Sequence, residues 1–183
     1  HFCIRGFFSK LTYFLLLVLS GCSNNPSADP SIFRMSIKTE PPTLDGTLAT
    51  DSVSVTILAN LMEGLTQYDA DLNPIPAVAK RWAYSNEGQT ITFYLRDNVY
   101  WSDGKKVTAE DFEYSWKRLL NPDTAAQYAY FLFDIKNASE YNSGIIKDKD
   151  KVGVRAVASD VLEVTLKKPV VYFPSITTFM VTY

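Results

Sequence analysis

Apolar and polar residues alternate in several short runs of this chain, a period of two that predicts strands with one buried face. The runs lie at 33–37, 90–96, 152–156 and 162–166. A short polar turn separates the last two runs, so we expect them to pair as neighbouring antiparallel strands.

A helix is predicted from about Ser54 to Glu63, with Gly64 near its C-terminal cap, because apolar residues recur there at the spacing of one helical face. A shorter helical piece is predicted near 77–82. The apolar residues of the longer helix are Leu58, Leu61, Met62 and Leu65.

A second amphipathic helix is predicted after Thr108, which can cap its N-terminus together with Asp111. Pro122 ends it, and Asp103-Gly104 upstream is typical of a hairpin turn. The order of elements predicts a mixed α/β fold with mostly antiparallel pairing in its later part. The buried face of this helix is expected to comprise Phe112, Trp116, Leu119 and Leu120.

Length and composition place the chain among globular proteins. With 183 residues, 46% hydrophobic and 21% charged, it can form one well-buried domain, or one domain and part of another. The formal net charge is only −2, and no Lys/Arg run is longer than two residues. A nucleic-acid partner is therefore not expected.

The first 21 residues have the pattern of a secretory signal peptide. Arg5 and Lys10 precede an apolar run at 11–19, which is shorter than the roughly 20 residues that span a bilayer. Leu-Ser-Gly-Cys follows and matches the bacterial lipobox, so lipidation is predicted at Cys22. The alternative is an ordinary signal peptide that happens to contain a cysteine.

Cleavage after residue 21 limits the chemistry of the mature chain. It removes His1 and Cys3, and the lipid consumes Cys22, so no histidine and no free cysteine remain. Triads that use His, zinc sites with His ligands and disulfides are thereby excluded. We expect no enzyme activity, no metal and no cofactor. Residues 22–31 are polar with two prolines and are expected to form a flexible tether.

Two acidic clusters are better explained by turns and caps than by catalysis or metal binding. Residues 69–73 begin like a calcium loop, but Pro74 occupies the position that needs glycine. Asp103 with Glu110 and Asp111 could be imagined as a carboxylate pair. However, Asp103 belongs to the turn and Asp111 to the helix cap, so we expect structural roles for both.

Seven short segments follow one another at compatible spacing between about Ile32 and Phe173. They are Glu40–Asp45, Glu63–Asp69, Pro76–Ala79 with Trp82, Phe93–Arg96, Trp101–Gly104, Val107–Phe112 and Tyr114–Arg118. Together they resemble the extracellular solute-binding proteins of family 5, which includes oligopeptide-, dipeptide- and nickel-binding proteins. Residues 121–129 and 152–166 look most like the oligopeptide-binding branch.

The resemblance implies a periplasmic-binding-protein-like clamshell of type II, in which two lobes close over an extended peptide. Residues 32–62 would then be the first strip of the core of lobe I. Residues 63–183 would be most of an antiparallel α+β subdomain inserted into that lobe. We accordingly expect the chain to be an N-terminal fragment that carries only part of the first lobe.

The implied function is that of the extracytoplasmic receptor of an ABC transporter that imports oligopeptides. Main-chain hydrogen bonds would supply affinity for peptides of varied sequence. The expected partners are a permease and an ATPase, and the receptor would be a monomer anchored by Cys22 in the bacterial cell envelope, facing the periplasm or the outside. Alternatives are a receptor for nickel, haem or another small ligand, or an envelope sensor or adhesin without transport.

The resemblance also implies where this part of the chain meets the ligand. Tyr128 matches a family tyrosine that borders the peptide, and Thr50, Asp51 and Ser52 fall where the first lobe approaches the ligand backbone. One family position there carries Glu where this chain has Thr50, which argues against a charged contact. The rings of Tyr128, Tyr130, Phe131 and Phe133 are expected to be mainly core, with one ring a candidate to face the ligand.

Overall fold

The computed structural model describes residues 31–183. The predicted leader at 1–21 and Cys22 lie outside the described residues, as does the predicted tether except for residue 31. Across 31–183 no helix is both long and apolar enough to cross a membrane.

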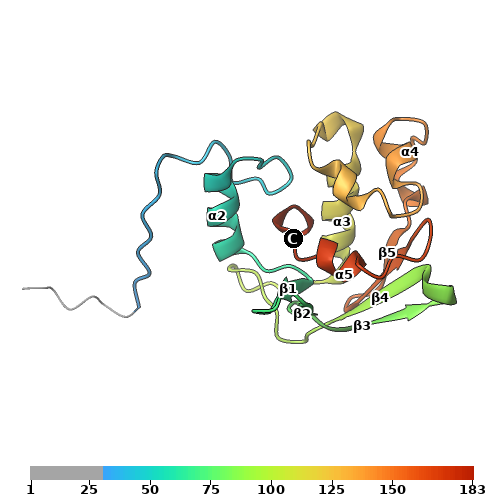
Figure 1. Ribbon diagram of the computed structural model, residues 1–183, viewed down its shortest axis with the longest axis horizontal. Coiled ribbons are helices and arrows are strands. Elements are labelled where there is room, and N and C mark those ends of the chain that lie inside the picture. The colour runs from blue at the N-terminus through green and yellow to red at the C-terminus, as the bar shows by residue number, and fades with distance from the viewer. Residues whose placement is uncertain (1–30) are drawn as a thin grey trace, which may run out of the picture. The chain divides into compact units, whose positions relative to one another are not determined.

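Figure 1 shows the short strands and helices in groups along the chain: β1 to β4 follow α2, then come α3 and α4, then β5 and β6, and finally α5. The helices are α2 (Ser52–Leu61), α3 (Ala109–Leu120), α4 (Ala138–Asn142) and α5 (Phe173–Ile176). The strands are β1 (Thr66–Tyr68), β2 (Pro74–Pro76), β3 (Ala79–Ser85), β4 (Thr90–Leu95), β5 (Val154–Ala158) and β6 (Val161–Thr165). Single 3-10 turns are η1 (Asn86–Gly88), η2 (Pro122–Thr124), η3 (Ala129–Leu132), η4 (Lys149–Lys151) and η5 (Met180–Thr182).

Four strands form an antiparallel sheet in the order β3-β4-β6-β5. Phe93 of β4 lies opposite Leu162 of β6, and Val154 of β5 lies opposite Val164 of β6. The strands predicted at 90–96 and 162–166 are confirmed, and the run at 152–156 forms β5 from Val154 onward. The predicted antiparallel pairing of the last two runs is also confirmed.

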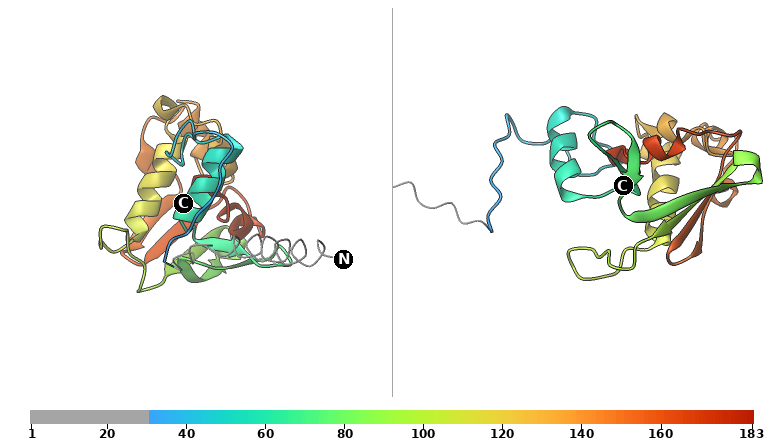
Figure 2. Two further views of the ribbon diagram at one scale, coloured as in Figure 1. Left: turned by 90° about the vertical axis from the view of Figure 1, so that its left-hand side faces the viewer. Right: turned by 60° about the horizontal axis from the view of Figure 1, so that its bottom comes forward.

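Helix α3 lies across one face of this sheet, as Figure 2 shows. Buried and less buried residues alternate along β4 and β6, because successive residues of a strand point to opposite faces, and α3 packs against β5 and β6. Burying this apolar surface is the main stabilising contribution to the fold. The buried side chains of the two layers include Ile91, Phe93, Leu95, Val154, Leu162 and Val164 from the sheet and Phe112, Trp116, Leu119 and Leu120 from α3.

The ends of α3 agree with the sequence pattern. At its start the Thr108 N–H donates to Asp111 Oδ2 at 2.8 Å, which completes the predicted capping box. At its end Asn121 takes an extended conformation and Pro122 opens η2. The predicted face of Phe112, Trp116, Leu119 and Leu120 is at most 4% exposed.

Strands β1 and β2 form a separate hairpin. In its turn the Asp69 carboxylate accepts the backbone N–H groups of Asp71 at 2.9 Å and Asn73 at 2.8 Å. These bonds use the oxygen that a calcium loop would offer to the ion. The prediction of a turn rather than a calcium site at 69–73 is therefore supported.

The helical piece predicted near 77–82 is wrong. Residues 79–85 form β3, which pairs along β4 and places Trp82 opposite Phe93, with their ring centroids 6.4 Å apart. The alanine-rich start of this segment favours a helix only weakly, whereas pairing with a buried strand supplies hydrogen bonds and aromatic packing. Tertiary pairing thus decides the conformation.

Helix α2 begins two residues earlier and ends two residues earlier than predicted. Met62, in extended conformation, occupies the C-cap position, so Gly64, expected near the cap, lies two residues beyond it. A Cβ atom on Gly64 would lie 2.8 Å from the carbonyl oxygen of Thr177 and would also overlap the ring of Tyr183. Gly64 is therefore required by close packing.

The strand predicted at 33–37 is also wrong. Residues 31–36 belong to a separate unit from 37–183, and Phe33 and Met35 are 79% and 40% exposed. The segment alternates as a strand should, but no strand within 31–183 pairs with it. Alternation concerns the side chains alone. A strand also needs a partner for its backbone hydrogen bonds.

Candidate functional site

The residues that precede α2 fold around one carboxylate; we call residues 43–51 the Asp45 loop. The Asp45 side chain accepts the backbone N–H of Thr47 at 3.0 Å. The backbone carbonyl of Asp45 accepts the N–H groups of Leu48 and Ala49, both at 3.0 Å. Thr47 and Ala49 are buried, so the loop is a small ordered turn that rests on the rest of the molecule.

Arg118, near the end of α3, binds this loop through both arms of its guanidinium. Nη1 donates to Asp45 Oδ1 at 2.8 Å and Nη2 donates to Asp45 Oδ2 at 2.5 Å. Nη1 also donates to the hydroxyl of Thr47 at 2.6 Å. The hydrogen bonds from Arg118 lower the pKa of Asp45, and the carboxylate in turn raises the pKa of Arg118.

We expect acid to release the Asp45 loop before it unfolds the sheet. The folded pKa of Asp45 lies below its ordinary value of 3.8, so its contact stabilises the fold above that pH and is lost as the pH falls through the folded pKa. Backbone NMR should therefore show the amides of Leu48 and Ala49 shifting before that of Phe93. Asp45→Asn should abolish this early step, and simultaneous change at all three amides would contradict the prediction.

Two of the three residues predicted at 50–52 to face the ligand belong to the start of α2. Asp51 is the N-cap, and its Oδ1 accepts the N–H groups of Val53 at 3.0 Å and Ser54 at 2.9 Å. Ser52 is the first residue of the helix and is exposed, as is Thr50. The Asp51 carboxylate therefore orients the helix, and Thr50 and Ser52 present the accessible polar groups.

Tyr128 and Thr50, two of the residues predicted to border the ligand, lie together. The hydroxyl of Tyr128 donates to the carbonyl oxygen of Thr50 at 3.4 Å, across 78 positions of sequence. This bond is long, so it joins the two segments only weakly. Asp51 and Ser52 follow Thr50 along the chain.

The aromatic cluster predicted around Tyr128 is only partly core. Tyr130 stacks on Phe131 with ring centroids 4.7 Å apart, and Tyr128 meets Phe131 edge-on at 5.7 Å. Phe131 also stacks on Phe179 at 4.6 Å. Tyr130 and Phe179 are 54% and 46% exposed, so the cluster has an open aromatic face. Phe133 is partly buried.

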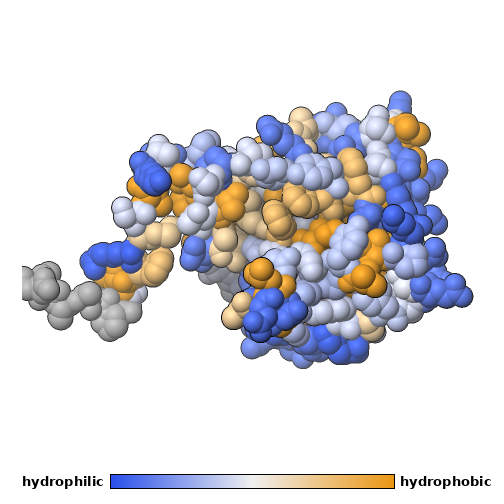
Figure 3. Space-filling view, in the orientation of Figure 1, coloured by the Kyte–Doolittle hydropathy of each residue, from blue (hydrophilic) through white to orange (hydrophobic). Residues whose placement is uncertain are grey.

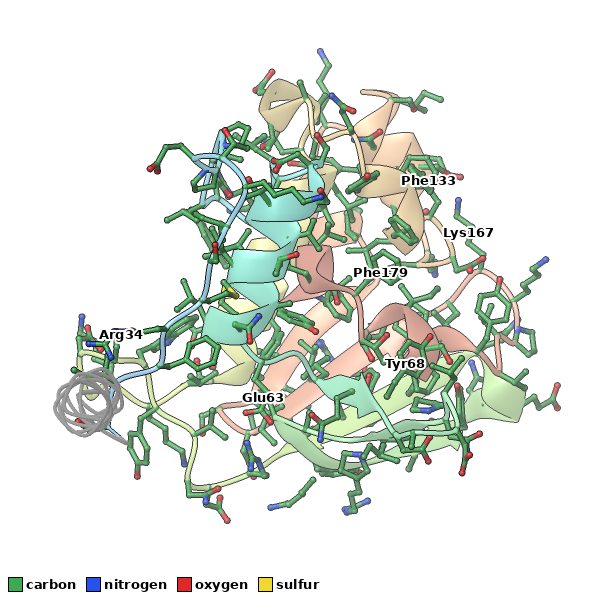
Figure 4. The ribbon with its side chains drawn as sticks, turned by 60° about the vertical axis from the view of Figure 1, so that its left-hand side comes forward. Arg34, Glu63, Tyr68, Phe133, Lys167 and Phe179 are labelled. Carbon is green, nitrogen blue, oxygen red and sulfur yellow. The ribbon has the colours of Figure 1, made fainter. Side chains whose placement is uncertain are left out.

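Phe179 is a member of this site that the sequence pattern did not indicate. It lies 48 positions after Phe131 and outside any periodic run, and only the course of the C-terminal segment brings it to the cluster. Figures 1 and 2 show that segment between α2 and α3. In Figure 4, Phe179 lies on the side of α2 that faces the segment with Phe133.

A cleft of about 760 Å3 lies between the end of α2, the hairpin at 99–102, α3 and the segment 180–183. Its walls include the exposed aromatic side chains of Tyr100, Trp101 and Tyr114. Figure 3 shows one face of the molecule, on which apolar surface gathers between the positions of α2 and α3 in Figure 1. The cleft does not include Thr50, Asp51, Ser52 or Tyr128, so it is distinct from the residues predicted to meet the ligand.

The chemistry of these groups favours binding. Asp103 accepts the N–H of Lys105 at 3.0 Å and Asp111 caps α3, so the imagined carboxylate pair is used structurally. Among residues 31–183, no group of three or more His, Cys, Asp or Glu side chains could hold a metal ion. What the site around Tyr128 offers is a phenol hydroxyl, exposed main-chain groups and aromatic faces.

Comparison with known proteins identifies the family. The model of the bacterial extracellular solute-binding proteins, family 5, matches residues 73–182. The oligopeptide-binding protein of Bacillus subtilis is 41% identical over 173 residues, which cover 89% of this chain and 32% of that protein. The dipeptide-binding protein of the same organism is 38% identical over 174 residues, 88% of this chain and 32% of that protein.

A solved structure shares the fold. The substrate-binding domain of an oligopeptide ABC transporter from Bacillus anthracis matches with a TM-score of 0.78 and 42% identity, over 81% of this chain and 29% of that chain. The mixed α/β fold expected from the resemblance, part of a periplasmic-binding-protein-like structure, is therefore confirmed. The chain spans about a third of the length of these relatives. It belongs to the bacterial extracellular solute-binding proteins of family 5.

Proposed function

We propose that this chain is part of an extracytoplasmic receptor that binds oligopeptides and delivers them to an ABC transporter. The observation that carries the proposal is sequence similarity. Nearly the whole chain aligns with relatives that are named for binding oligopeptides and dipeptides. The open aromatic face beside Thr50 and Tyr128 supports it, because a peptide backbone can lie against aromatic rings and exchange hydrogen bonds with main-chain groups.

In this proposal the site works by binding alone. Thr50 and Ser52 offer uncharged polar groups to the peptide backbone, and Tyr128 offers its ring edge and hydroxyl. Such contacts recognise what all peptides share, so they permit broad sequence tolerance. No bond of the ligand needs to be broken, and we propose that the protein is not an enzyme.

The placement of the segments follows the same proposal. Residues 32–62 would form the first strip of lobe I and residues 63–183 most of the subdomain inserted into it. The receptor would be a monomer, anchored to a membrane of the cell envelope by lipid on Cys22 after removal of the leader 1–21. A permease and an ATPase would receive the peptide.

The test is ligand binding by the full-length gene product, measured by calorimetry. We expect tetra-alanine to bind and Ni2+ to show no heat of binding, and dialanine reports the preference for length. Binding of Ni2+ without binding of either peptide would replace the proposal with that of a metal receptor. Absence of all three signals from folded protein would reject both.

Replacing Tyr128 with alanine should lower the affinity for tetra-alanine about tenfold, since one aromatic contact and one hydrogen bond are lost. Tyr68→Ala is the matched control, because Tyr68 also donates its hydroxyl to a backbone carbonyl at 3.4 Å but lies on β1. The control should bind peptide as the unaltered protein does. Equal losses in the two variants would place Tyr128 outside the ligand site.

A further inference from the structure

The segments that form the candidate site approach one another from distant parts of the chain. Tyr128 follows α3 after a connection of seven residues, whereas Thr50 lies on the Asp45 loop ahead of α2. The hydrogen bond that joins them directly, from the Tyr128 hydroxyl to the Thr50 carbonyl, is 3.4 Å long. A bond of that length is too weak to determine how the two segments sit.

Helix α3 provides a stronger connection. Tyr128 is fixed to its end by chain continuity and by η2, in which Asn121 accepts the N–H of Asp123. The Asp45 loop is fixed to the same end of α3 by Arg118. The last turn of α3 is therefore connected to both sides of the site.

The contact made by Arg118 differs from an ordinary surface ion pair. Exposed pairs usually contribute little, because two long side chains must be held in one geometry against solvent. Here Asp45 and Arg118 side chains are only 33% and 35% exposed, and the guanidinium makes three hydrogen bonds, the third to the buried Thr47. A planar fork that binds both carboxylate oxygens also fixes orientation, which a lysine ammonium cannot do.

The internal bonds of the loop transmit this orientation to Thr50. Asp45 holds the N–H of Thr47 with its carboxylate and the N–H groups of Leu48 and Ala49 with its carbonyl. Ala49, directly before Thr50, is 0% exposed. Once Arg118 fixes the Asp45 side chain, few conformations remain for the next five residues.

We propose that Arg118 is a positioning residue for the ligand site: by gripping Asp45 and Thr47 it holds Thr50 and the start of α2 at a set distance from Tyr128. In this role Arg118 acts through the Asp45 loop and needs no contact of its own with the ligand. Its effect on peptide affinity rests on the proposed function, whereas its effect on the loop does not.

The first measurement is amide hydrogen exchange of the full-length gene product without ligand. Arg118→Lys keeps the charge but loses the fork, and Asp45→Asn keeps the shape but loses the charge. Both should speed exchange at Leu48 and Ala49 about tenfold, the equivalent of one to two hydrogen bonds. Exchange at Phe93 in the sheet should not change.

Asp150→Asn is the matched control. It removes an ion pair from Lys117, the neighbour of Arg118 on α3, but that pair lies toward η4 and away from the Asp45 loop. We expect this variant to leave the exchange of Leu48 and Ala49 unchanged. Unchanged exchange in Arg118→Lys and Asp45→Asn as well would overturn the proposal.

The second measurement is tetra-alanine binding by the full-length gene product. Arg118→Lys should weaken binding about tenfold, the effect of one mispositioned contact, while its melting temperature stays close to that of Asp150→Asn. Full affinity in Arg118→Lys despite faster loop exchange would overturn the positioning role and leave the proposed function intact. If the unaltered protein binds no peptide, the proposed function fails, and the exchange experiment alone decides whether Arg118 holds the loop.

Discussion

Trp116→Ala is expected to lower the free energy of unfolding by about 3–5 kcal/mol, the range for removing a large aromatic side chain from a well-packed core. Trp116 is 0% exposed, and its ring lies edge-on to Phe173 with centroids 6.1 Å apart. Its Nε1–H donates to the carbonyl of Thr182 at 2.8 Å. The alanine variant thus loses packing and also leaves a buried carbonyl without its donor. Urea unfolding followed by circular dichroism measures the change.

Two further variants separate the contributions of Trp116. Trp116→Phe keeps most of the packing and loses the hydrogen bond, so we expect about 1–2 kcal/mol of destabilisation, plus any cost of poorer fit. Trp101→Ala removes a ring that is 42% exposed on a hairpin and should change stability much less than Trp116→Ala. Comparable losses in Trp101→Ala and Trp116→Ala would show that α3 is not the centre of the core.

Lys117→Met is expected to destabilise the fold by about 2–3 kcal/mol, less than the loss typical of breaking a fully buried pair. Nζ of Lys117 lies 2.6 Å from Glu113 Oε1 and 2.8 Å from Asp150 Oδ1, and the lysine side chain is 10% exposed. The other oxygen of Glu113 accepts the N–H of Ala156 on β5 at 2.7 Å. Without the ammonium group, Glu113 remains half-buried with its charge unmatched. Thermal and urea unfolding at pH 7 measure the effect.

The destabilisation caused by Lys117→Met should decrease at high pH. Burial alone would lower the pKa of Lys117, but hydrogen bonds and charge attraction from Asp150 and Glu113 outweigh it and raise the pKa above 10.5. The ion pairs therefore stabilise the protein fully below pH 10.5 and cease to do so as the pH rises through the folded pKa. The difference between Lys117→Met and the unaltered protein should shrink in strong alkali. A difference that grew there would contradict this account.

Asp150→Asn serves again as the comparison for Lys117→Met. The Asp150 side chain is 71% exposed, so water solvates it in either state, and Lys117 keeps Glu113 as a partner in this variant. We expect a clearly smaller loss than for Lys117→Met. An equal loss would mean that the link from α3 to η4, rather than the charge balance at Glu113, stabilises this region.

Local sequence patterns correctly predicted the elements that are stabilised by contacts between residues close together in the chain. The capping box at Thr108 and Asp111, the turn at Asp69 and the alternation in β4 and β6 all agree with the structure. Caps and turns close hydrogen bonds within three or four residues, so the residues involved appear together in the sequence. Alternation in a strand likewise reports directly which face is buried.

Predictions failed where a distant partner decides the conformation. The alternating run at 33–37 has no partner strand within residues 31–183, and the alanine-rich 79–85 segment becomes β3 because β4 pairs with it. Gly64 is explained by the later segment with Thr177 and Tyr183, which local spacing cannot reveal. The candidate site has the same character, since Phe179 and Arg118 join it only through the fold.

The sequence by itself determined the mixed α/β class, the helix α3 with its buried face, and the resemblance to the solute-binding proteins of family 5. These rest on contacts between near neighbours in the chain or on ordered motifs. Only the tertiary structure decided that Thr50 meets Tyr128, that Phe179 extends the aromatic face, and that Arg118 grips Asp45. Each of these contacts joins segments at least 48 positions apart, and it forms because burial of the core brings α3 and the segments around it together.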